Sequence, residues 1–99
     1  MKAPTLEIEG KKYQATVPKM SAWRKLIKIR TSEVDFDSEE ALDMMLDFIS
    51  DVFNNPRVTK ESIEENVAIE DFFAMFQEAG KWIEHRMNEK MDKIDSGNA

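Results

Sequence analysis

Three aspartates, Asp43, Asp47 and Asp51, recur every four residues in the acidic stretch SEEALDMMLDFISDVFNN. Residues four apart lie on one face of a helix, so these carboxylates form a row that a divalent cation or an acid/base pair could use. A hard cation takes several oxygen ligands that converge from different directions, and carboxylates along a single helix do not enclose an ion. The spacing therefore favours a solvated acidic face, close to a basic helix earlier in the chain, over a metal site.

The one histidine, His85, has Glu89 four residues after it, a spacing at which both side chains can ligate one metal. No cysteine or second histidine exists to complete a transition-metal site. The helical projection places His85 in the polar arc, so we interpret it as an exposed surface residue. The serines have no glycine-rich elbow around them, and three glycines are too few for a phosphate-binding loop. We therefore predict no catalytic residue, no metal, no cofactor and no enzyme activity.

The strongest pattern in the chain is apolar and lies in residues 69–87, IEDFFAMFQEAGKWIEHRM. Intervals of three and four place these residues in one helical stripe: Ile69, Phe72, Phe73, Phe76, Gly80, Ile83 and Met87. With Met75 and Trp82 beside the stripe, the apolar arc covers roughly half of the circumference, whereas a helix on one core needs an arc only somewhat wider than about 100°. The excess predicts contact with another protein.

We expect Phe72 and Phe76 to hold the core and the flanking residues to bind a partner. Methionine suits either role, because its unbranched thioether fills irregular gaps in a core and also repacks against different partners. The predicted protein-binding residues are Met75, Trp82, Met87 and Met91. Substituting Met75 by Asp or Trp82 by Glu is expected to leave thermal stability nearly intact. Formation of a homo-oligomer is expected to cover the surface when no other partner is present.

The elements predicted around the candidate binding residues make a mostly helical fold of the α+β class, in a single domain over residues 1–94. An N-terminal β-hairpin followed by three to four helices is predicted, with a polar tail at residues 95–99. The expected hairpin spans residues 5–17, and the expected helices span residues 19–30, 39–54, 60–65 and 68–92. Thr59 is expected to cap the short third helix, and Asp37 with Glu40 the helix before it.

A two-residue turn at residues 9–10 sets the predicted register of the hairpin, with Leu6 opposite Tyr13. A slip of one residue would pair a polar side chain with Leu6, so the apolar pattern supports this register. The expected apolar face consists of Leu6, Ile8, Tyr13, Ala15 and Val17. This face is expected to pack against helices that contain Trp23 and Phe53.

Charge is distributed unevenly along this chain, whose net charge is −6. Residues 1–30 carry eight Lys or Arg against two Glu, whereas residues 31–56 carry eight Asp or Glu and no base. The acidic segment can neutralise its basic neighbour within the fold, which disfavours nucleic acid as a partner. With no apolar run of about 18 residues and no leader peptide, the sequence predicts a soluble intracellular protein without a membrane partner.

The order of elements resembles that of the tail assembly chaperones of long-tailed (siphovirus-type) bacteriophages and prophages of Gram-positive bacteria. The resemblance covers roughly residues 5–90 and is carried by LEIEGKKYQATVP, SAWRKLIKI, FNNPRVTKESIEENV and EDFFAMFQEAGKWI. It implies a non-enzymatic protein that binds the long, helical, apolar tape measure protein and keeps it soluble while the tail tube assembles around it. It also implies the major tail tube protein as a second candidate partner, the host bacterial cytoplasm as the location, and absence from the mature virion.

A second function stays open on the sequence alone. A small helical adaptor or regulator of a mobile element would contact nucleic acid through its basic first helix, which carries Arg24, Lys25, Lys28 and Arg30. Phosphate contacts weaken steeply with added salt, whereas apolar helix packing changes little. A salt titration therefore separates the two functions.

Overall fold

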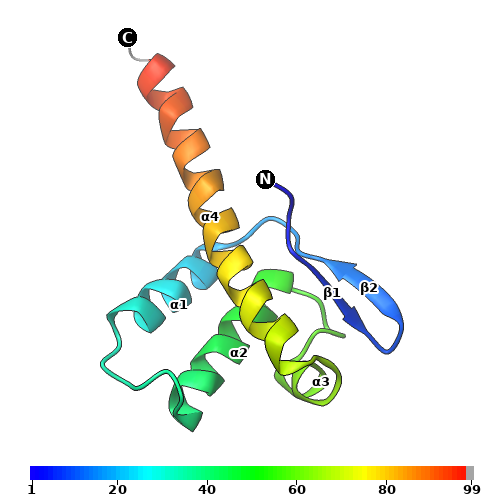
Figure 1. The fold of residues 1–99 in the computed structure, drawn as a ribbon. Coiled ribbons are helices and arrows are strands. Elements are labelled where there is room, and N and C mark those ends of the chain that lie inside the picture. Colours follow the sequence, from blue (N-terminus) through cyan, green and yellow to red (C-terminus); the bar gives the residue numbers. More distant parts are fainter. Residues whose placement is uncertain (98–99) are drawn as a thin grey trace.

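A two-stranded hairpin and four helices make up the computed structural model, which describes the backbone of residues 1–97 and the side chains of residues 1–91. The elements are β1 (Thr5–Ile8), β2 (Lys11–Gln14), α1 (Met20–Thr31), α2 (Glu39–Phe53), α3 (Lys60–Asn66) and α4 (Ile69–Gly97). In Figure 1, α1 lies to one side of α4, and the hairpin and α3 lie to the other. The predicted α+β class, with a hairpin followed by helices in one domain, is confirmed.

The hairpin has the predicted register, in which Leu6 pairs with Tyr13. Both turn residues have positive φ, 52° at Glu9 and 80° at Gly10, as a two-residue type I′ turn requires. Alternation along β1 then buries Leu6 and Ile8 on one face, and β1 packs on α3.

The apolar face of the hairpin is shorter than predicted. Ladder pairing ends at Gln14, and one further hydrogen bond, donated by Ala15 N to Pro4 O at 2.9 Å, ties the chain to the start of β1. Ala15 is buried, but beyond it the chain leaves the hairpin toward α1, and Val17 is exposed. The prediction that Val17 packs into the core was wrong, because it extended the alternation past the last paired residue.

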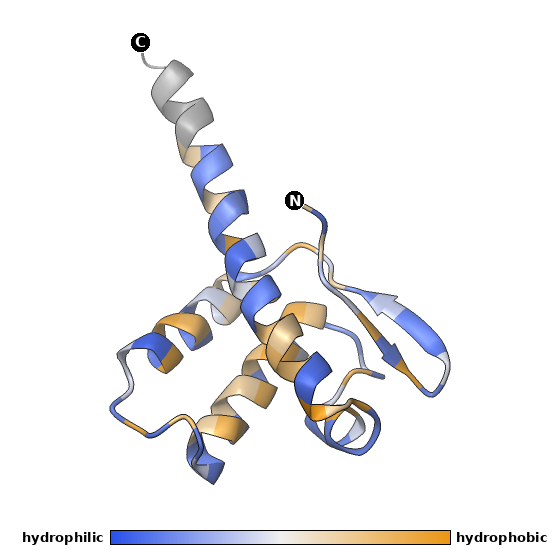
Figure 2. Ribbon diagram, viewed as in Figure 1, coloured by the Kyte–Doolittle hydropathy of each residue, from blue (hydrophilic) through white to orange (hydrophobic). Residues whose placement is uncertain are grey.

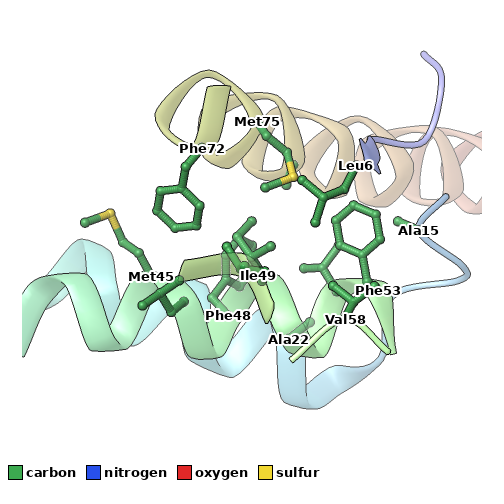
Figure 3. Packing of buried hydrophobic residues seen from close by; sticks show 14 of the residues in the cluster. Leu6, Ala15, Ala22, Met45, Phe48, Ile49, Phe53, Val58, Phe72 and Met75 are labelled. Atoms are coloured by element: carbon green, nitrogen blue, oxygen red, sulfur yellow. The ribbon is translucent and has the colours of Figure 1, made fainter. Parts of the chain in front are cut away.

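Helix α2 runs through the centre of the core. Phe48 is fully buried, and its ring meets Phe76 of α4 edge-on, with 5.7 Å between ring centroids. The helix contacts both α1 and α4, so its buried arc is wider than a single apolar stripe. Figure 3 shows Leu6, Phe53 and Met75 gathered where the hairpin joins the cluster of buried residues.

Side-chain caps and a left-handed residue fix the ends of α2 and α3. Ser38 Oγ accepts a hydrogen bond at 3.1 Å from the amide three residues later, so the cap lies one residue after the predicted Asp37. Asn54 ends α2 at φ 48° and ψ 48°, a conformation that Asn tolerates better than most residues. Thr59 caps α3 as predicted, by accepting a hydrogen bond from Ser62 N at 3.1 Å.

Helix α4 is the longest element, and its 29 residues extend about 43 Å at 1.5 Å per residue. Its C-terminal turns stand clear of the rest of the domain (Figure 1), and its second half is mostly hydrophilic where coloured, whereas its first turns are largely hydrophobic (Figure 2). The helix continues past residue 92 to Gly97, since no proline interrupts it. Of the predicted tail, residues 98–99 lie outside the described part of the chain. None of the described helices has the length and hydrophobicity that crossing a bilayer requires.

Candidate protein-binding surfaces

The aspartate row of α2 faces α1, and Lys25 of α1 forms ion pairs with two of the three aspartates. Lys25 Nζ lies 3.1 Å from Asp51 Oδ2 and 3.2 Å from Asp47 Oδ2. Ser21 Oγ donates a hydrogen bond to Asp51 Oδ1 at 3.1 Å. Asp43, one turn earlier, is exposed. The contacts agree with the predicted position of the row beside the basic helix and give two of its carboxylates a structural role, which is to join α1 to α2.

The surroundings of Lys25 raise its pKa. Partial burial disfavours the charged amine and by itself would lower the pKa, but hydrogen bonds and charges from Asp51 and Asp47 outweigh burial and raise the pKa above its ordinary value of 10.5. The amine therefore carries its charge at neutral pH, where it forms ion pairs with the two aspartates.

The polar residues considered as metal ligands do not converge in the described part of the chain. His85 is exposed, as predicted, and its Nε2 lies 3.5 Å from Glu89 Oε1. A cleft of about 550 Å³ between the hairpin and α4 is bordered by several carboxylates, among them Glu7, Asp71 and Glu78. Among the described residues, however, no three His, Asp or Glu side chains come close enough together to hold a metal ion.

Met75 and Trp82 lie in the core, with only 5% and 3% of their surface exposed. Met75 points toward Leu6 of the hairpin (Figure 3), and Arg86 covers the indole of Trp82, with 5.5 Å between the guanidinium carbon and the ring centroid. Helix α1 approaches α4 closely at Gly80. The prediction that Met75 and Trp82 lie outside the core was wrong, because α4 packs against α2, the hairpin and α1 at once and buries a wider arc than a helix on one core.

An open apolar groove of about 480 Å³ lies between the start of α1 and the second half of α4. Its apolar lining includes Met20, Trp23, Ile83 and Met87, and its charged lining consists of Lys19, Arg86 and Lys90. We call this surface the basic-rimmed groove. Met20 is 78% exposed, and Met91, one turn beyond Met87, is 58% exposed. Two of the four residues predicted to bind a protein, Met87 and Met91, therefore lie in or beside this groove.

A second open apolar groove, of about 310 Å³, lies between α2, α3 and the first turns of α4. Its apolar lining includes Leu42, Leu46, Ile63, Val67, Ile69 and Phe73. Among the described residues that line it, Glu64 alone is charged, and we call this surface the acid-rimmed groove. Ile69 is 75% exposed, and Phe73 also reaches solvent. Helical spacing placed both residues in the apolar stripe of residues 69–87. Spacing gives the side of a helix on which a residue lies, but not the point along the helix at which the core ends.

Comparison with known families matches residues 1–98 to the family described as phage tail chaperone protein. The chain belongs to the phage tail chaperone family. No curated protein and no solved structure matches it. The predicted resemblance to phage tail chaperones is thus confirmed, and membership implies protein partners in tail assembly.

In this tail chaperone, the basic helix α1 is less suited to nucleic acid than its sequence indicates. Lys25 is held by two aspartates of α2, and Arg30 forms an ion pair with Glu84 of α4. A cation that is already paired contributes less to binding a phosphate backbone. Arg24 and Lys28, the other two bases of the helix, are exposed. Half of the basic residues considered for nucleic acid thus serve to join the helices of the tail chaperone.

Proposed function

We propose that this tail chaperone binds the tape measure protein of its phage and keeps that long, apolar, helical chain soluble while tail tube subunits assemble around it. Family membership carries the proposal, and the open apolar grooves support it, since such grooves receive apolar helices. In this proposal the phage is a long-tailed phage of Gram-positive bacteria, and the major tail tube protein is a second partner. The chaperone acts in the host cytoplasm, catalyses no reaction and is absent from the mature virion.

The basic-rimmed groove is the proposed client site. Met20 and Met87 on its two walls are flexible apolar side chains, and Met91 extends the same side of α4 by one further turn. A client helix can lie along α4, whose C-terminal turns stand clear of the domain (Figure 1), with the client's apolar side chains between α1 and α4. The bases at the rim favour a client segment with acidic residues beside its apolar face.

Co-expression with the tape measure protein of the same phage tests this function. The unmodified chain is expected to keep the tape measure protein in the soluble fraction. Met87→Lys or Met20→Lys is expected to leave most of it in the pellet, because an ammonium group beside the basic rim cannot be buried under an apolar client. Phe36→Lys is the matched control, since Phe36 is exposed and lies outside both grooves.

The results of this experiment test the chaperone function and the client site separately. An insoluble tape measure protein in the presence of the unmodified chain would contradict the chaperone function. A tape measure protein that stays soluble with both groove variants would contradict the client site alone.

Purified virions test the proposed absence of the chain from the finished particle. Mass spectrometry is expected to detect the tail tube and tape measure proteins but not this chain. Its presence in a fixed ratio to the tape measure protein would identify a structural component of the tail instead.

A further inference from the structure

The outer edge of β1 has no strand beside it. Within the described residues the sheet has two strands, so β1 pairs with β2 along one edge only. In an antiparallel pair, successive residues turn their backbone N–H and C=O groups alternately toward the partner strand and away from it. The hydrogen bond from Ala15 N to Pro4 O fixes this alternation, so Thr5 and Glu7 direct their backbone groups to the free edge. An extended peptide can add to such an edge as a further strand.

This free edge borders the cleft between the hairpin and α4, which we call the hairpin cleft. Its volume of about 550 Å³ lies within the range of about 300–1,000 Å³ that is usual for ligand sites. Thr5 and Glu7 line the cleft from β1, and the other wall comes from the connection between α3 and α4 and from the first half of α4. The buried side chains of Leu6 and Met75 also line it. The cleft therefore combines an open strand edge with apolar side chains.

The charges that line the hairpin cleft are all negative. They belong to Glu7 and Glu9 of the hairpin and to Asp71 and Glu78 of α4, and no base is among the described lining. All four side chains are exposed. Lys12 lies opposite Glu7 in the hairpin, but the ion pairs of the described residues include neither side chain. Because carboxylates lie on both walls, a cationic segment between them is attracted and an anionic one is repelled.

We propose that the hairpin cleft binds an extended, lysine- or arginine-bearing segment of a partner protein, which adds to the free edge of β1 as a third strand. Backbone hydrogen bonds to Thr5 and Glu7 hold the segment, and its successive side chains point to opposite faces. Apolar side chains on one face contact Leu6 and Met75, and basic side chains lie among the carboxylates. The cleft shares no lining residue with the basic-rimmed groove, so this site does not depend on the proposed client site.

Fluorescence anisotropy with labelled peptides tests the proposal on the purified chain. The probe is a short peptide of alternating lysine and valine, which as a strand has one basic and one apolar face. We expect it to bind, whereas a peptide of alternating glutamate and valine is not expected to bind. A lysine–valine peptide with a methyl group on every backbone nitrogen keeps the charge but has no N–H donors, and it is also not expected to bind.

Variants of the chain test the strand edge and the charge separately. Thr5→Pro removes an N–H donor from the free edge and leaves the pairing with β2 intact, since an edge position tolerates proline. It is expected to weaken binding of the lysine–valine peptide by about three- to tenfold, whereas Thr5→Val keeps the donor and should bind as the unmodified chain does. Glu78→Lys is expected to weaken binding by about two- to fivefold. Glu89→Lys is the matched control, because it changes the net charge equally at an exposed position of α4 outside the cleft.

Circular dichroism melts establish that each variant is folded. An unmodified chain that does not bind the lysine–valine peptide, or that binds its N-methylated form as tightly, overturns the proposal. So does a Thr5→Pro variant that binds as tightly as Thr5→Val, or a Glu78→Lys variant that binds as tightly as Glu89→Lys. Sedimentation velocity without peptide tests the other possible occupant. Smaller species for Thr5→Pro than for Thr5→Val would assign the free edge to a second copy of this chain and would also overturn the proposal.

Discussion

At the hairpin turn, two adjacent residues take left-handed backbone conformations, and they differ in how well they tolerate them. Gly10 has φ 80° and open space where a Cβ would be, so only the backbone conformation requires glycine there. Glu9, at φ 52°, occupies a region that costs most residues with a Cβ about 1–2 kcal/mol. Substitutions at the two positions should therefore have opposite effects.

Gly10→Ala is expected to lower the free energy of unfolding by about 1 kcal/mol. Glu9→Asn is expected to raise it by about 0.5–1 kcal/mol, since Asn-Gly is the preferred sequence of a type I′ turn. Urea unfolding of both variants measures the two changes. A Gly10→Ala variant as stable as the unmodified chain would contradict the turn geometry.

Trp82 and Phe48 are core residues by their burial, and truncating either one leaves a cavity. Trp82→Ala and Phe48→Ala are each expected to cost about 3–5 kcal/mol, which is a large part of the stability of an ordinary domain. Met91→Ala, at an exposed position on the same helix as Trp82, is the control and should change stability by less than about 0.5 kcal/mol. If Trp82→Ala melts at the temperature of the unmodified chain, this side chain is not held in the core.

Among the elements, α1 and α2 are joined both by burial and by charge. Helix α1 packs on α2 and contributes buried residues to the core, and Lys25 forms ion pairs with Asp47 and Asp51 across this contact. Because the amine is partly exposed, its contribution to stability is modest. The pH dependence of the free energy of unfolding nevertheless distinguishes the contribution of the ion pairs from that of the apolar contact.

The folded-state pKa of Lys25 lies above its ordinary value of 10.5, so the charged amine stabilises the folded chain at lower pH, and this stabilisation is lost as pH rises through the folded-state pKa. The unmodified chain should therefore lose its advantage over Lys25→Met as the pH rises above 10.5. Chemical unfolding of both proteins at a series of pH values measures the difference, and the remaining lysines titrate in both. A difference that does not shrink would show that Lys25 acts through its hydrocarbon stem.

The types and order of the elements were predictable because each depends on local signals, such as the turn at residues 9–10 and the cap at Thr59. Their packing was not, because the apolar arc of one helix does not reveal how many neighbours share it. Helix α2 contacts α1, α3 and α4, and α4 also meets α1 at Gly80 and Glu84, which places Phe48 and Trp82 in the core. Val17 shows the complementary error, since alternation in the sequence continues after strand pairing has ended.

Over the whole molecule, two apolar grooves with rims of opposite charge lie at different points along α4. Met87 and Met91 were predictable as candidate binding residues, because methionine repacks against different partners, and both lie in or beside the basic-rimmed groove. The acid-rimmed groove was not, because its residues come from three elements and their exposure depends on how those elements pack.

The distribution of charge over the molecule disfavours binding to nucleic acid. The net charge is −6, and ion pairs with acids of α2 and α4 engage Lys25 and Arg30. Fluorescence anisotropy with a labelled DNA duplex is expected to show no binding at physiological salt. Binding that weakens steeply as salt is added would favour the adaptor function instead.

Site-specific photo-crosslinking tests most directly whether the basic-rimmed groove holds the tape measure protein. A photoreactive amino acid replaces Met87 in one variant and Phe36 in a control variant, and each is co-expressed with the tape measure protein of the same phage. We expect a crosslinked product that contains the tape measure protein from position 87 and none from position 36. Crosslinks from position 87 to a second copy alone, or equal yields from the two positions, would contradict the client site.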